Sequence, residues 1–80
     1  MASYRIVIRE SAEAEMMAVP FPFRRQINTH IFKLKKIQRP PDSERIAEGE
    51  YFRLPVAGWR IVYEVDDASL VVTIIAIGRA

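Results

Sequence analysis

The stretch GWRIVYEV, residues 58–65, decides how this chain folds. Its odd-numbered positions, from Trp59 to Val65, are all large and apolar or aromatic, whereas Arg60 and Glu64 lie between them. This alternation is typical of a β-strand with one buried face. The strand therefore places a permanent cation, Arg60, at the centre of its other face.

Two further strands are predicted beside it, at 50–56 and 69–78. A two-residue turn at Ala57-Gly58 would place Val56 opposite Trp59, so that the apolar residues of both strands share one face. A second turn at 66–69, with Val65 opposite Leu70, would add the alternate apolar residues of the last strand to the same face. Trp59 would then lie opposite Ala76 in this register.

The other face of these strands collects cations over a partly apolar floor. In the predicted register, Arg53, Arg60 and Arg79 share this face with Tyr51. Arginine suits a phosphate because its planar guanidinium can bind two oxygens at once and stays charged. The structural alternative is an ordinary exposed face, on which each arginine is solvated or pairs with an acid such as Glu50 or Glu64.

The first half of the chain predicts one strand and two helices. Residues 3–10 alternate as a strand, and 10–19 read as a helix that Ser11 caps and Pro20 ends. Pro22 can open a second helix, whose apolar positions 23, 27, 31, 34 and 37 form one stripe and which ends at RPPD, residues 39–42. Residues 43–50 read as a loop or a single helical turn.

We therefore predict a single α+β domain over residues 1–80, with the order β-α-α-β-β-β. The N-terminal strand and helical hairpin would pack on one face of an antiparallel sheet, in two layers. The chain has no cysteine and one histidine, His30, so we expect no metal and no cofactor. We place His30 on the helix layer, either at its surface or half-buried.

Charge is concentrated in the second helix. The net charge is +2 and the pI is about 9.3, yet residues 24–39 hold six cations and no acid. We expect these cations to bind RNA or phosphate, or else to form a solvated face: Arg24, Arg25, Lys33, Lys35, Lys36 and Arg39. The opening residues MASYRIVIRE have no hydrophobic signal segment, and no apolar run approaches the ~20 residues of a membrane span. We expect a cytoplasmic protein without a membrane partner.

The motifs RLPV, GWRIVYEVDD and IIAIG, in this order, resemble the C-terminal half of RelE/ParE-superfamily toxins, and the resemblance covers nearly the whole chain. It implies the RelE-like fold and the toxin of a bacterial type II toxin–antitoxin pair, silenced by a cognate antitoxin. RelE-like members cut mRNA on the ribosome by attack of the 2′-hydroxyl on the adjacent phosphate. ParE-like members block DNA gyrase instead.

The resemblance also assigns roles to single residues. Arg60 matches the arginine that stabilises the scissile phosphate, Arg53 matches the first arginine of the preceding strand, and Arg79 falls where the family has His or Lys. Pro55 stands where a second basic residue is usual. Ala80, the last residue, stands where the final arginine is usual, and many active members carry a C-terminal tyrosine or histidine beyond that position.

These assignments leave three functions open. Arginine is no ordinary general base, because its pKa exceeds 12. Tyr51 would serve as an acid, stack on a base, or be a cross-strand aromatic.

The first hypothesis is a ribosome-dependent mRNA endoribonuclease, with ribosome and mRNA as partners and no small-molecule substrate. The second is a gyrase inhibitor, and the third is a non-catalytic toxin that only binds its antitoxin. Phe21 and Phe32 would form part of an antitoxin surface or pack beneath a loop.

Overall fold

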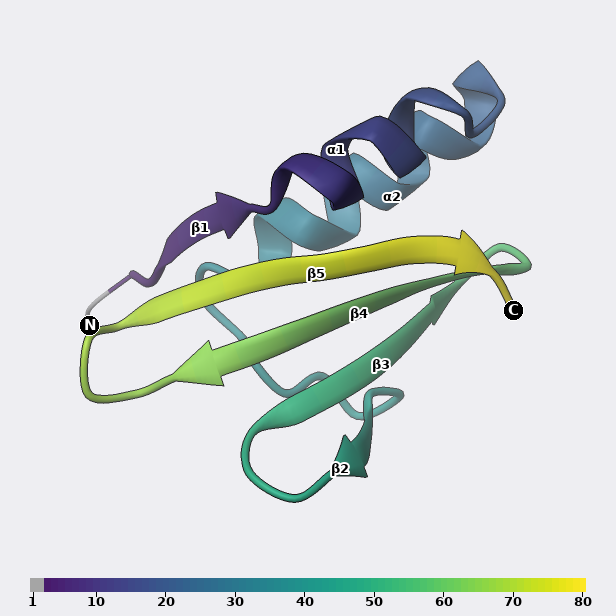
Figure 1. Ribbon diagram of the computed structural model, residues 1–80. Coiled ribbons are helices and arrows are strands. Elements are labelled where there is room, and N and C mark those ends of the chain that lie inside the picture. The colour runs from purple at the N-terminus through teal and green to yellow at the C-terminus, as the bar shows by residue number, and fades with distance from the viewer. Residues whose placement is uncertain (1–2) are drawn as a thin grey trace.

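A five-stranded sheet carries two helices on one face in the computed structural model, which describes residues 3–80 (Figure 1). The predicted α+β, two-layer class is confirmed. The strand order across the sheet is β1-β5-β4-β3-β2. The elements are β1 (Arg5–Ile8), α1 (Glu10–Met17), α2 (Phe21–Lys33), β2 (Glu44–Ala47), β3 (Tyr51–Val56), β4 (Trp59–Asp66) and β5 (Val71–Arg79).

Two features of the sheet differ from the prediction. Residues 44–47 form an edge strand, β2, and not a loop or helical turn; β2 pairs antiparallel with β3. All four of its residues are exposed, so the sequence carries no alternation to reveal it. The sheet is also mixed, because β1 pairs with β5 in parallel while the other neighbours are antiparallel.

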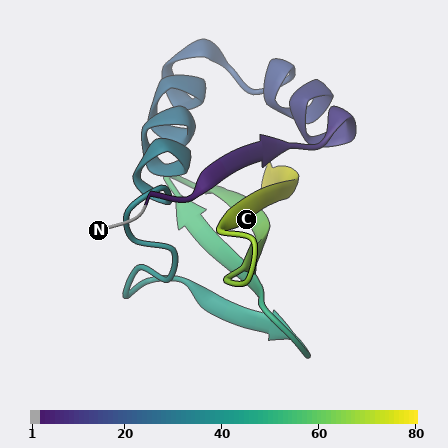
Figure 2. The same cartoon turned by 90° about the vertical axis from the view of Figure 1, so that its left-hand side faces the viewer.

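The helices begin and end near the predicted positions. The expected cap at Ser11 is wrong: α1 already begins at Glu10, and no side chain caps it. Pro22 lies in the first turn of α2, where its missing N–H is no loss. Helix α2 ends at Lys33, about a turn earlier than expected, and a hydrogen-bonded turn follows at 34–36. Figure 2 shows both helices lying on the same side of the twisted sheet.

The predicted register of the first hairpin is confirmed. Val56 pairs with Trp59, and Leu54 pairs with Ile61. The turn residues Ala57 and Gly58 have φ angles of 51° and 84°. Positive φ at both central residues is the geometry of a type I′ turn, which suits the twist of the two strands.

The predicted register of the second hairpin is wrong. Asp66 pairs with Val71, so the four-residue loop spans 67–70 and not 66–69. The Asp66 carboxylate accepts hydrogen bonds from the backbone N–H groups of Ala68 and Ser69, at 3.0 and 3.2 Å, which stabilises the turn at this position. A bulge then follows in β5: Tyr63 pairs with Ile74, but Val62 pairs with Ala76, which leaves Ile75 without an opposite residue.

The core lies between the sheet and the helices. Ile27 and Leu34 of the helix layer meet Ile61, Tyr63 and Ile74 of the sheet, and all are fully buried. The Tyr63 hydroxyl reaches the helix layer and donates a hydrogen bond to the Gln38 carbonyl at 2.8 Å. The core therefore fixes which side of β3 and β4 faces the helices and leaves the opposite side uncovered by them.

Candidate phosphate-binding site

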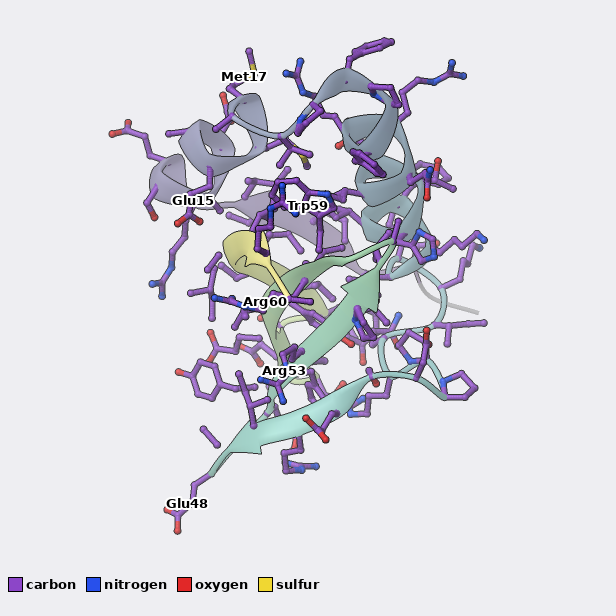
Figure 3. The ribbon with its side chains drawn as sticks, turned by 90° about the vertical axis from the view of Figure 1, so that its right-hand side faces the viewer. Glu15, Met17, Glu48, Arg53, Trp59 and Arg60 are labelled. Atoms are coloured by element: carbon purple, nitrogen blue, oxygen red, sulfur yellow. The ribbon has the colours of Figure 1, made fainter. Side chains whose placement is uncertain are left out.

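A hollow of about 270 Å³ lies on the sheet face opposite the helices. Figure 3 shows two of its arginines, Arg53 on β3 and Arg60 on β4, on the part of the sheet that lies away from both helices. The hollow therefore brings together cations from adjacent strands. Its lining residues are Asp42, Glu44, Arg53, Pro55, Arg60 and Ala80.

Arg60 is held by packing and not by a carboxylate. It pairs with Gly78 across β4 and β5, and its guanidinium lies beside this glycine. A Cβ placed on Gly78 would be 3.6 Å from Nη2 and 3.7 Å from Cζ of Arg60. None of the salt bridges within residues 3–80 involves Arg60, although the side chain is half-buried. An oriented cation is therefore left free to bind an anion.

Arg53 also reaches the hollow, but it already has an anionic partner. Its Nη2 forms a salt bridge with Glu44 Oε1 on the neighbouring edge strand. The two side chains remain 48% and 64% exposed, so water screens the pair and it stabilises the fold little. A phosphate could therefore replace the carboxylate at Arg53 at small cost.

Sequence reasoning missed two acidic residues of the hollow, Asp42 and Glu44. The acids of residues 42–50 were visible in the sequence, but no alternation marked β2. Only the pairing of Glu44 with Arg53 in adjacent strands brings its carboxylate to the arginines. The hollow therefore combines carboxylates with the two arginines, and a carboxylate can act as a general base.

Tyr51 shares the open face, as predicted, but it does not line the hollow. It pairs with Glu64, lies one alternate position before Arg53 on β3, and is half-buried. A role for its hydroxyl or its ring at the hollow stays a prediction.

The prediction that Arg79 shares the open face is wrong. The bulge at Ile75 shifts the alternation of β5 by one residue, so Arg79 pairs with Trp59 on the helix side of the sheet. Its Cζ lies 5.0 Å from the centre of the Trp59 ring, a cation–π contact. The Trp59 ring in turn lies 6.3 Å from the ring of Phe23. The structure does not bring Arg79 to Arg53 and Arg60.

Two of the six predicted phosphate ligands from 24–39 are engaged in internal contacts. Arg24 donates to the carbonyls of Met17 and Val19, at 3.0 and 3.1 Å, and so closes the corner between α1 and α2. Arg39 forms salt bridges with Glu50 and Asp67. Their internal contacts give both arginines a structural role.

The other four cations lie on the helix layer, away from the hollow. Lys33, Lys35 and Lys36 line a separate groove of about 310 Å³ with Phe32 and Ile37. Lys35 Nζ lies 5.0 Å from the centre of the exposed Phe32 ring. Arg25 borders another surface hollow, on α2. Phosphate binding by these four residues stays a prediction, at a surface other than the hollow. His30 is half-buried on α2, as expected.

Arg39 organises a charged cluster at the other end of β3. It holds the pKa of Glu50 below its usual value, and Arg45 acts in the same direction. Hydrogen bonds from the Tyr4 hydroxyl, at 2.5 Å, and from Arg39 lower the pKa of Asp67. The cluster therefore ties β1, β2, β3 and the β4–β5 turn to the segment after α2.

Neither a metal site nor a membrane span is found in the part of the chain that the structure describes. Residues 3–80 contain no group of three or more histidine, cysteine or acidic side chains that could hold an ion. Within the same residues, no helix combines the length and the apolar character needed to cross a membrane.

Comparisons with known proteins relate the chain to one family. The sequence profile of the family described as the ParE toxin of the type II toxin–antitoxin system parDE matches residues 6–80. No curated protein sequence matches the chain significantly.

Solved structures share the whole fold at low identity. A chain of the intact E. coli RelBE toxin–antitoxin complex has a TM-score of 0.86 and 22% identity, covering 98% of both chains. A chain of the Mycobacterium tuberculosis RelBE2 complex has a TM-score of 0.84 and 15% identity, covering 98% of this chain and 99% of that one. A chain of the Pyrococcus horikoshii RelE–RelB complex has a TM-score of 0.84 and 16% identity, covering 96% and 94%.

Proposed function

The chain belongs to the ParE toxin family and is the toxin of a type II toxin–antitoxin pair, and we propose that it inhibits translation by cutting mRNA on the ribosome. The observation that carries the proposal is Arg60: a half-buried, oriented arginine without a carboxylate partner among residues 3–80. An arginine held in this way is suited to bind a phosphate and to stabilise the charge that develops on it.

The residues of the hollow support a complete cleavage step. Arg60 binds the non-bridging oxygens of the scissile phosphate, and Arg53 joins it after exchanging Glu44 for the phosphate. The freed Glu44 carboxylate takes the proton of the 2′-hydroxyl, whose oxygen then attacks phosphorus. The bond to the 5′-oxygen breaks, and this oxygen takes a proton from water. The products are a 2′,3′-cyclic phosphate and a 5′-hydroxyl.

A cognate antitoxin is the second partner of the proposal. The similar proteins from E. coli, M. tuberculosis and P. horikoshii were each solved in a toxin–antitoxin complex. We expect an antitoxin to bind this chain in the cytoplasm, where ribosomes and mRNA are present. A bound antitoxin would prevent contact between the hollow and the ribosome.

Inhibition of DNA gyrase is the alternative function. It is favoured by the name of the matching family and by the position of Arg79, which leaves the hollow with fewer cations than the resemblance implied. A toxin that acts by binding gyrase needs neither a general base nor an exposed phosphate site. Cleavage of mRNA therefore requires Arg60 and Glu44, whereas inhibition of gyrase does not.

A paired assay separates these functions. Purified toxin is added to a reconstituted translation reaction, in which mRNA fragments are mapped, and to a gyrase supercoiling reaction. We expect translation-dependent cleavage by the native protein, loss of at least about a hundredfold in Arg60→Ala, and a comparable loss in Glu44→Gln. Arg9→Ala, which removes an exposed arginine just before α1, serves as the matched control.

Three results would overturn the proposal. Inhibition of supercoiling without mRNA cleavage would establish the gyrase alternative. Full cleavage by Arg60→Ala would remove the assigned role of the hollow. Antitoxin binding with neither activity would leave a non-catalytic toxin.

A further inference from the structure

We propose that Glu15, in the helix layer, is a positioning residue for Arg60 on the opposite face of the sheet, acting through the last residues of β5. The inference rests on the proposed function only where cleavage is measured. Its structural part concerns how the Arg60 guanidinium is held and is tested separately.

β5 changes its neighbour halfway along its length. β1 pairs with residues 71–74 of β5, ending at the pair Ile8–Ile74, and the chain then enters α1. After the bulge at Ile75, residues 76–79 of β5 pair only with β4. The outer edge of this segment therefore faces α1 and not another strand, and its backbone N–H groups need another acceptor.

Glu15 supplies that acceptor. Its Oε1 accepts a hydrogen bond from the Ile77 N–H at 2.9 Å, in a partly buried position. Figure 3 shows Glu15 on α1, beside the end of β5. The side chain of a helix residue therefore takes the place of the missing strand partner. At the other end of the segment, the Ala80 N–H donates to the Gly58 carbonyl at 3.0 Å.

The residue that follows Ile77 is Gly78, against which Arg60 packs. The Arg60 guanidinium lies where a side chain on Gly78 would begin, since an added Cβ would be 3.6–3.9 Å from Nη2, Cζ and Nη1. The backbone at Gly78 is thus the surface on which the guanidinium rests. A shift of residues 76–79 would move that surface, and small displacements of catalytic groups reduce rates strongly.

The side-chain N–H resonance of Arg60 tests this link without any RNA. We expect Glu15→Ala to shift and broaden the Arg60 Nε–Hε signal in a ¹H–¹⁵N spectrum, because the guanidinium then samples several positions. Glu15→Gln keeps a carbonyl oxygen that can accept the Ile77 N–H, so we expect a native signal. Glu13→Ala removes a neighbouring acid of α1 and is the control.

Three further variants cover the case in which Glu15→Ala fails to fold. Glu15→Asp keeps the charge but is one methylene shorter, and we expect it to shift the Arg60 signal in the same direction. Gly78→Val places a branched side chain against the guanidinium and should displace it, whereas Gly78→Ala makes only an ordinary van der Waals contact. An Arg60 signal that stays native in Glu15→Asp or Glu15→Ala would overturn the proposal.

A double-mutant cycle separates positioning from general stability. We expect Glu15→Ala to slow ribosomal mRNA cleavage about tenfold with an intact Arg60, and to have no further effect in an Arg60→Ala background. An equal loss in both backgrounds would mean that Glu15 supports only the fold. If the native protein cleaves no mRNA, the function proposed above fails, while the Arg60 resonance still decides whether Glu15 positions the guanidinium.

Discussion

Arg60 lies near the start of β4 without disturbing the core, because the helices cover only one face of this strand. Trp59 and Ile61 point toward the helices, so Arg60 between them must point the other way. The opposing residue is Gly78, which leaves room for the guanidinium. A strand covered on one side can therefore present an oriented cation on the other side.

Ala57 occupies a backbone conformation that its side chain disfavours. Its φ of 51° lies in the left-handed region, and Asn-Gly is the preferred pair for a type I′ turn. We predict that Ala57→Asn stabilises the protein by about 0.5–1 kcal/mol, measured by urea denaturation. Ala57→Val, which is β-branched, should destabilise it. A less stable Ala57→Asn variant would contradict this account of the turn.

The Tyr63 hydroxyl connects the sheet to the segment after α2. Its hydrogen bond to the Gln38 carbonyl is 2.8 Å long, and the tyrosine is fully buried. We predict that Tyr63→Phe lowers the free energy of unfolding by about 1 kcal/mol, since a partly buried carbonyl loses this partner. Tyr51→Phe, on the open face, should leave the stability within about 0.5 kcal/mol of native. Equal changes in the free energy of unfolding for the two substitutions would contradict a stabilising role of the Tyr63 hydroxyl.

At the scale of the elements, alternation predicts a strand but not every detail of its pairing. The first hairpin was predictable because a two-residue turn and two alternating strands allow only one register with an apolar face. The second was not, because the Asp66 turn shifts the four-residue loop by one position and the bulge at Ile75 changes which face later residues occupy. Arg79 was misplaced for this reason.

β2 also could not be predicted from alternation. All four residues of β2 are exposed, so its sequence shows no alternation of buried and exposed positions. The strand is recognised only by its pairing with β3. The site therefore divides in two: Arg53 and Arg60 were predictable from alternation, whereas Asp42 and Glu44 required the three-dimensional structure. A carboxylate on an exposed edge strand leaves no signal in a single sequence.

At the scale of the whole molecule, the Arg39 cluster joins segments that are far apart in the chain. Arg39 bridges Glu50 and Asp67, and Tyr4 also donates to Asp67. The pKa values of both carboxyl groups are lowered in the folded state. Their contribution to stability is therefore present above the pKa of the unfolded state and is lost as the pH falls through the lower pKa of the folded state.

The lowered pKa values of these two carboxyl groups lead to a pH-dependent prediction for Arg39. We expect Arg39→Gln to be less stable than the native protein at pH 7 in low salt. The difference should shrink as the pH falls below about 4, where the carboxyl groups become protonated. Urea denaturation at both pH values measures it, with Arg25→Gln as the control. A difference of the same size at both pH values would contradict an electrostatic role of the cluster.

The most direct test of the account compares the three arginines that the sequence placed on one face. Ribosome-dependent mRNA cleavage is measured for Arg53→Ala, Arg60→Ala and Arg79→Ala at equal protein stability. The structure keeps only Arg53 and Arg60 at the hollow, so we predict the largest loss for Arg60→Ala, a smaller loss for Arg53→Ala, and near-native cleavage for Arg79→Ala. A loss in Arg79→Ala as large as that in Arg60→Ala would contradict the account.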